Sequence, residues 1–215
     1  MIKKARIAIV AGGDSSEYEV SLKSAANIFS AIDTQKFQPW LVILKGKTWS
    51  VMENEKKIAD IDKSDFSFLL NREKITFDFA YITIHGTPGE DGILQGYFDL
   101  MKIPYSTSNL HSSSLTFNKW FCKNYLQNFH VPMAKSVVLH KGEPVEPARI
   151  IGEMGLPVFV KPSAGGSSFG ITKVKTREEL EAAVRLAWKE SPDALVEEFI
   201  EGTEYTCGLV KLKEK

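Results

Sequence analysis

The sequence predicts an α/β protein in two parts, an N-terminal domain built on a parallel sheet and a second, β-rich domain. Three observations predict this fold class. Strand-like and helix-like segments alternate through the first third of the chain, strand formers dominate after Pro132, and 215 residues with 43% hydrophobic content suit one large or two small domains. Such alternation indicates parallel strands covered by helices on both faces.

Composition and charge exclude several classes of protein. The 27 Lys+Arg and 27 Asp+Glu balance, which argues against disorder and against a nucleic-acid partner. The two cysteines, Cys122 and Cys207, form no CxxC pair, so neither a disulfide scaffold nor a structural zinc site is expected. The apolar run 7–11 is too short for a signal peptide, and no stretch approaches a membrane span. We therefore expect a cytoplasmic protein with no membrane partner.

The first half contains the expected elements of the parallel sheet. Strands are expected at residues 6–10, 40–44, 79–85 and 103–105. Asp14 or Ser15 is the expected N-cap of a first helix, whose small and apolar residues recur at helical spacing. A second amphipathic helix is expected over 93–101. The polar stretch 53–70 reads as a surface excursion with a short helix.

The second half is richer in strands. Helices are expected to start near 112–114 and to cover 119–129, 147–154 and 180–188. Strands are expected at 136–140, 158–162, 170–174 and 194–200. Thr176 and Glu179 form a capping box before the last helix. Residues 204–212 have the character of a strand at a sheet edge.

The segment VFVKPSAGGSSFGITKV, residues 158–174, has the chemistry of an anion site. Its glycines let backbone N–H groups approach a ligand, its serines add hydroxyl donors, and Lys161 supplies a positive charge. This combination suits a polyphosphate, although the segment lacks the Walker A pattern. The alternative is a flexible hairpin turn with an exposed lysine.

The strand-like segment 194–205 places carboxylates beside this loop in sequence. Glu197 could accept a hydrogen bond from an amino group such as that of adenine, and Glu204 could accept from ribose hydroxyls. The strand alternation puts Glu197 and Phe199 on one side and Glu198 and Ile200 on the other. The alternative is a solvated edge strand.

Two further loops carry candidate groups. In GGDSSEYEVS, residues 12–21, Glu17 could hold a ligand ammonium group, or it could merely complement the helix dipole. In HGTPGEDG, residues 85–92, His85 lies near two acids, but the spacing matches no metal-ligand pattern. A hydrogen-bonded structural loop is the alternative there.

Together these segments resemble the D-alanine–D-alanine ligase family of ATP-grasp enzymes. GGDSSEYEVS, HGTPGEDGILQGYFDLMKIPY, VKPSAGGSSFG and EEFIEGTEYT occur in the family's order and at similar separations. The resemblance implies a Rossmann-like N-terminal domain over residues 1–112 and the first part of an ATP-grasp domain over 113–215.

The resemblance also implies roles for individual residues. It assigns Glu17 and Ser167 to catalysis, and Glu17 and His85 to binding the first D-alanine. It assigns ATP binding to Lys119, Lys161, Ser168, Glu197, Glu198, Phe199, Ile200 and Glu204. The family commonly has arginine or another polar residue where this chain has Ala164, which implies fewer side-chain contacts to phosphate.

The implied reaction joins two D-alanines through an acyl phosphate formed from ATP, for peptidoglycan synthesis. The family uses Mg²⁺ or Mn²⁺, whose ligands are expected beyond Lys215, so this fragment alone is expected to be inactive. A homodimer through the N-terminal domain is a further expectation. D-alanine–D-lactate or D-alanine–D-serine ligation, or a non-catalytic nucleotide-binding module, are the alternatives.

Overall fold

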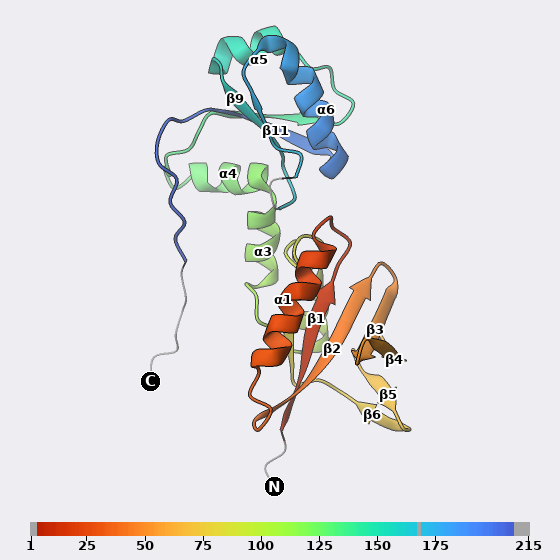
Figure 1. Cartoon of the computed structure of the whole chain (residues 1–215). Coiled ribbons are helices and arrows are strands. Elements are labelled where there is room, and N and C mark those ends of the chain that lie inside the picture. Colours follow the sequence, from red (N-terminus) through yellow and green to blue (C-terminus); the bar gives the residue numbers. More distant parts are fainter. Residues whose placement is uncertain (1–3, 167–168, 209–215) are drawn as a thin grey trace.

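The computed structural model describes residues 4–166 and 169–208, which form two larger sheets joined by a pair of helices and a third sheet of two short strands (Figure 1). The strands are β1 (Ala5–Gly12), β2 (Phe37–Lys45), β3 (Thr48–Glu53), β4 (Lys56–Asp60), β5 (Phe68–Leu70), β6 (Glu73–Ile75), β7 (Phe79–Ile82), β8 (Ser136–His140), β9 (Val158–Pro162), β10 (Thr172–Val174) and β11 (Asp193–Glu198). The helices are α1 (Tyr18–Ala31), α2 (Ile93–Met101), α3 (Leu110–Phe117), α4 (Lys119–Gln127), α5 (Pro147–Met154), a 3-10 turn η1 (Arg177–Glu179) and α6 (Leu180–Glu190).

The first sheet has the order β4-β3-β2-β1-β7 and is only partly parallel. Strand β1 pairs in parallel with β2 and β7, whereas β3 and β4 add antiparallel strands at one edge. The short helix expected within 53–70 is therefore wrong. Asn54 and Glu55 both have positive φ, which is the geometry of a tight hairpin turn, and it folds the polar stretch back as strand.

Strand β1 supports a core on each face of this sheet. Ala8 and Val10 face a cluster that includes Phe66 and Phe98, while Ile9 belongs to the smaller cluster under α1. The alternation follows from the period of two along a strand. The α/β fold class with a parallel-containing sheet is thus confirmed.

The helix cap expected at Asp14 or Ser15 is wrong. Helix α1 begins at Tyr18, after Glu17. The Asp14 carboxylate accepts from the N–H of Gly46 at 2.6 Å, and the Ser15 hydroxyl donates to the carbonyl oxygen of His85 at 2.7 Å. Both side chains hydrogen-bond to neighbouring loops. These distant partners take the side-chain oxygens that would otherwise cap the start of the helix.

The ends of two other expected strands differ. The third strand stops at Ile82, and the strand expected at 103–105 reduces to a single bridge between Ala80 and Tyr105. Residues 204–208 form no strand, and 209–212 lie outside the described residues.

The second sheet has the order β10-β9-β11-β8, and its three pairings are antiparallel. Helices α5 and α6 cover one face, where Ile150 and Val184 pack with Val160 and Val196. The predicted capping box of Thr176 and Glu179 is confirmed. The opposite face carries the alternate residues of β9 and β11, including Lys161 and Glu197, and Glu197 contacts α4 through Lys123.

Helices α3 and α4 connect the two sheets (Figure 1). Asn118 separates the helices, and its side chain accepts from the N–H of Phe121 at 3.1 Å as the N-cap of α4. This junction brings Lys119 to the start of the segment between β9 and β10, called the glycine-rich loop below.

Candidate active site

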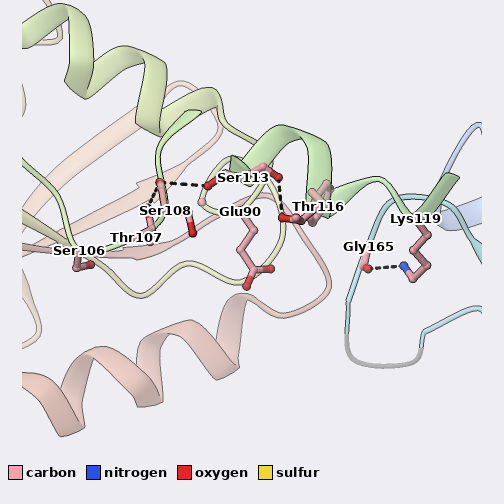
Figure 2. Close-up of a pocket in the computed structure, with 10 residues that line it drawn as sticks. Glu90, Ser106, Thr107, Ser108, Ser113, Thr116, Lys119 and Gly165 are labelled. Atoms are coloured by element: carbon pink, nitrogen blue, oxygen red, sulfur yellow. Dashed lines mark hydrogen bonds between the residues drawn. The ribbon is translucent and has the colours of Figure 1, made fainter. Parts of the chain in front are cut away.

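The first residues of the glycine-rich loop are fixed against the α3–α4 junction. The Ser163 hydroxyl donates to the side-chain oxygen of Asn118 at 2.8 Å, and the N–H of Lys119 donates to the Ser163 carbonyl oxygen at 2.7 Å. Lys119 also reaches the loop with its side chain, since its Nζ donates to the carbonyl oxygen of Gly165 at 2.9 Å (Figure 2). Ser163 is fully buried. The loop therefore leaves β9 from a rigid base.

Glu197 lies between two lysines on the sheet face opposite α5 and α6. Its Oε2 accepts from Lys161 Nζ at 2.6 Å, and its Oε1 accepts from Lys123 Nζ, also at 2.6 Å. Strand β11 lies between β9 and β8, so the alternative of a solvated edge strand is wrong. Lys161 is paired and largely buried, so the alternative of an exposed lysine is also wrong.

The electrostatics of this cluster favour a bound anion. Burial lowers the pKa of Lys119, and the neighbouring charge of Lys161 lowers it further. Burial by itself would raise the pKa of Glu197, but the hydrogen bonds from Lys123 and Lys161 outweigh it and lower that pKa. Three lysines and one glutamate thus meet here, and the excess positive charge suits a polyphosphate.

The segment after β11 presents backbone and aromatic groups beside these charges. The Phe199 ring lies 6.0 Å from that of Phe159 and 3.7 Å from Lys173 Nζ. Lys135 N–H donates to the Glu198 carboxylate at 2.7 Å. Ile200 is 63% exposed, and Glu204 is exposed as well.

Glu17 reaches the glycine-rich loop from the first sheet. The residue is buried, and a Cβ at Gly166 would lie 2.6 Å from its Oε2. A cavity of about 370 Å³ lies here, lined by the turn after β1, the loop at Gly86 and Thr87, residues 164–166 and the end of α6. The carboxylate therefore lies at the junction of the two sheets.

His85 lies in the loop that borders this cavity. Its Nε2 is 3.4 Å from the Ser24 hydroxyl, and its Nδ1 is 4.0 Å from a Glu90 oxygen. Glu90 in turn accepts from the N–H of Gly86 at 2.8 Å. These contacts match the structural-loop alternative, and the residues after His85, Gly86 and Thr87, line the cavity.

A second cavity, of about 600 Å³, adjoins the first at Phe117 and Gly165. Figure 2 shows hydroxyl-bearing side chains around it, together with Glu90 and Lys119. Its lining includes Ser106, Thr107, Ser108, Ser113 and Thr116. The sequence did not indicate these as site residues, because isolated serines and threonines have no distinctive spacing.

The structure brings most of the expected site residues together. Lys119, Lys161 and Glu197 form one cluster, and Glu17 meets the same loop at Gly166. Ser167 and Ser168 lie outside the described residues. Sequence reasoning missed Lys123 and Asn118, although the N-cap position of Asn118 before a helical pattern was a readable signal.

Within residues 4–166 and 169–208, no cluster of three or more His, Cys, Asp or Glu side chains could hold a metal ion. In the same part of the chain, no helix combines the length and hydropathy needed to cross a membrane.

Comparison with known families finds matches along most of the chain. The model of the D-ala D-ala ligase N-terminus matches residues 6–108, and that of the D-ala D-ala ligase C-terminus matches residues 125–215. A D-alanine--D-alanine ligase of Phocaeicola vulgatus is 51% identical over 212 residues, and one of Bacteroides thetaiotaomicron is 52% identical. Each alignment covers 99% of this chain and 65% of the relative, so the chain spans about two thirds of these relatives' length.

Solved structures give the same result. D-alanyl-alanine synthetase A of Vibrio cholerae matches with a TM-score of 0.82 and 29% identity, covering 94% of this chain and 61% of that one. The VanG D-Ala:D-Ser ligase of Enterococcus faecalis matches with a TM-score of 0.79 and 32% identity, covering 93% and 64%. The overall fold is that of the ATP-grasp ligases. With two family models in register and relatives of about half-identical sequence, the chain belongs to the D-alanine–D-alanine ligase family.

Proposed function

We propose that this chain provides the ATP-binding and first-substrate part of a ligase that joins two D-alanines, through an acyl phosphate, for peptidoglycan synthesis. The single observation that carries the proposal is the convergence on one loop. Lys119 binds Gly165, Lys161 pairs with Glu197 from the end of β9 that leads into the loop, and Glu17 lies against Gly166.

The proposed ATP contacts follow from the chemistry of each group. Lys119 and Lys161 offer positive charge to the phosphates, and the glycine-rich backbone, with Ser168, offers N–H and hydroxyl donors. Glu197 accepts from the adenine amino group and Glu204 from the ribose. The backbone of residues 198–200 reads the remaining edge of the ring.

The proposed substrate contacts lie across the loop from the nucleotide. Glu17 holds the ammonium group of the first D-alanine, and His85 borders that site. Ser167 joins Glu17 in a catalytic role from the loop.

The chemistry explains why the two sites must share this loop. A carboxylate is a poor electrophile until phosphorylation gives it a leaving group, and the amine of the second D-alanine then displaces phosphate. Lysines and loop amides stabilise the charge on the transferred phosphoryl group. A loop that covers both sites would exclude water from the acyl phosphate.

The proposal includes Mg²⁺ or Mn²⁺ as the ion that accompanies ATP and neutralises phosphate charge. Such an ion takes carboxylate and phosphate oxygens, and Glu197 is already held by two lysines. The described residues do not fit as its ligand set.

The rest of the proposal concerns the surroundings of the site. We place the domain division between residues 112 and 113, the protein in the cytoplasm, and a homodimer contact in the N-terminal domain.

A second candidate function has a specific observation in its favour. The solved D-Ala:D-Ser ligase of Enterococcus faecalis is 32% identical and has a TM-score close to that of the Vibrio cholerae protein. Its likeness supports D-serine as an alternative second substrate. A D-alanine–D-lactate ligase and a non-catalytic nucleotide-binding module are the remaining alternatives.

The test uses the chain completed with the part of the Phocaeicola vulgatus relative that lies beyond the alignment, called the completed ligase below. We expect phosphate release from ATP to depend on D-alanine and to exceed the rates with D-serine or D-lactate as second substrate. Nucleotide binding without phosphate release would support the module instead. The unaltered relative serves as the reference for assembly of an active site.

Two substitutions in the completed ligase test the residue roles. Glu17→Gln should raise the KM for D-alanine about tenfold or more, because it removes a charged hydrogen bond, and leave ATP binding within twofold. Lys161→Ala should weaken ATP binding by a similar factor. Unchanged D-alanine affinity in the first variant, or unchanged ATP affinity in the second, would contradict the assigned role.

A further inference from the structure

Lys123 is a charged residue that the proposed reaction does not use, yet its side chain is largely buried and makes two hydrogen bonds. Only 14% of its side chain is exposed. Its Nζ donates to the Ala134 carbonyl oxygen at 2.8 Å and to Glu197 Oε1 at 2.6 Å.

The geometry shows that the carboxylate of Glu197 is divided between two partners. Lys161 holds Oε2 from β9, and Lys123 holds Oε1 from α4. A carboxylate has about four lone-pair positions, so both oxygens retain capacity for a further donor. The adenine amino group proposed above can therefore bind Glu197 while Lys123 remains in place.

The charges show why two lysines are needed. Lys161 is proposed to bind phosphate, but in the structure it contacts Glu197. If Lys161 turned to a phosphate and Glu197 had no other cation, a largely buried carboxylate would remain unpaired, which is costly. Lys123 removes that cost because it stays paired with Glu197.

We propose that Lys123 is a positioning residue that holds Glu197 as an ionised acceptor for the nucleotide base and thereby frees Lys161 for the phosphates. This inference rests on the proposed function. It goes beyond it by assigning a part to a residue outside the glycine-rich loop and outside strand β11. The hydrogen bond from Lys123 Nζ to the Ala134 carbonyl oxygen gives the lysine ammonium group a second partner besides Glu197.

A purely structural role for Lys123 makes a different prediction. In that case the lysine would only tie α4 to the segment before β8, and its loss would lower stability without changing the pH dependence of ATP binding. The groups that face Glu197 are Lys123 from α4, Lys161 from β9 and, at longer range, Lys119. In the proposed role, removing Lys123 raises the pKa of Glu197. As the pH is lowered, Glu197 is then protonated earlier, and ATP binding should be lost at a higher pH than in the wild type.

The first experiment measures ATP binding and steady-state kinetics of Lys123→Met in the completed ligase. We expect the KM for ATP to rise about tenfold, the KM for D-alanine to stay within twofold, and the acid loss of ATP binding to move up by about one pH unit. Lys123→Arg should recover most of the ATP affinity because it restores the positive charge. Lys141→Met is the matched control, since that lysine also donates to a carbonyl oxygen, of Trp188, and should change none of these values.

A double-mutant cycle with Glu197→Gln separates the role from general damage. If Lys123 acts through Glu197, Lys123→Met should add less than a twofold further loss of ATP affinity in the Glu197→Gln background. Independent effects that multiply would overturn the inference, as would unchanged ATP binding in Lys123→Met. If Lys123→Met does not fold, Lys123→Arg and Lys123→Gln carry the same comparison, and equal acid profiles in these two variants would overturn it.

Failure of the inference is distinguishable from failure of the proposed function. Wild-type completed ligase that binds no ATP contradicts the proposed function. If the wild type binds ATP and turns over D-alanine, and the Lys123 variants show unchanged ATP binding and pH dependence, only the inference is contradicted.

Discussion

The close contact between Glu17 and Gly166 requires that residue 166 has no side chain. Glu17 is buried at the start of α1, and its carboxylate fills the space that a Cβ on Gly166 would need. The glycine lets the loop lie directly on the carboxylate, as close approach of backbone requires. Any side chain at position 166 must displace the proposed ammonium-binding group.

Gly166→Ala should therefore impair the first substrate site. Because the clash is with the flexible end of Glu17 rather than with backbone, the protein should fold, and the KM for D-alanine in the completed ligase should rise about tenfold. ATP affinity should change less. Gly152→Ala is the control, since a Cβ there meets nothing within 4 Å, and equal D-alanine kinetics in both variants would contradict the contact.

At the scale of elements, the start of α4 and the start of the glycine-rich loop form one unit. Asn118 caps α4 and accepts from Ser163, and the next residue, Lys119, donates to the Ser163 carbonyl. The helix end and the loop thus share one set of hydrogen bonds. Lys119 is held at the loop by its backbone as well as by its side chain.

Asn118→Ala should lower the free energy of unfolding by about 1 kcal/mol for the lost cap, and by more because Ser163 loses its acceptor. Asn118→Asp keeps an oxygen that can accept from both the Phe121 N–H and the Ser163 hydroxyl, so it should recover most of that stability. Urea unfolding of the 215-residue chain measures both. A loss of stability in Asn118→Asp equal to that in Asn118→Ala would show that the shared oxygen is not the cause.

The sequence predicted many elements because their signals are local. The capping box of Thr176 and Glu179 is confirmed in full, and α5 has its predicted bounds at 147–154. The hairpin at Asn54 was missed because its positive φ values follow from pairing between strands that the polar composition did not indicate. Asp14 and Ser15 failed as caps since more distant partners took their hydrogen-bonding groups.

At the scale of the whole molecule, the candidate site exists only where the two sheets meet. Glu17 comes from the turn between β1 and α1 of the first part, and Lys161 and Glu197 come from the second sheet. Lys119 lies on the helix pair between them (Figure 1). The geometry of the site therefore depends on how both parts pack, and its charged cluster contributes to the stability of the fold.

The depressed pKa of Glu197 predicts how stability responds to acid. Its ordinary value is 4.5 and its folded value is lower, so its ion pairs stabilise the fold fully above about pH 4.5. That contribution disappears as the pH falls through the lower, folded value. Glu197→Gln should be less stable than wild type at pH 7, and the difference should narrow below pH 4.5 in urea unfolding at a series of pH values. A constant difference would contradict the shift.

The sequence by itself determined the fold class, most helices and strands, and the motifs that identify the family, because these depend on neighbours within a few residues. Only the tertiary structure decided that Lys123 shares Glu197 with Lys161, and that Glu17 meets Gly166. Lys123 and Glu197 are 74 positions apart, and Glu17 and Gly166 are farther apart still. Contacts at such separations depend on how the sheets and helices pack, and no local pattern of residues specifies that packing.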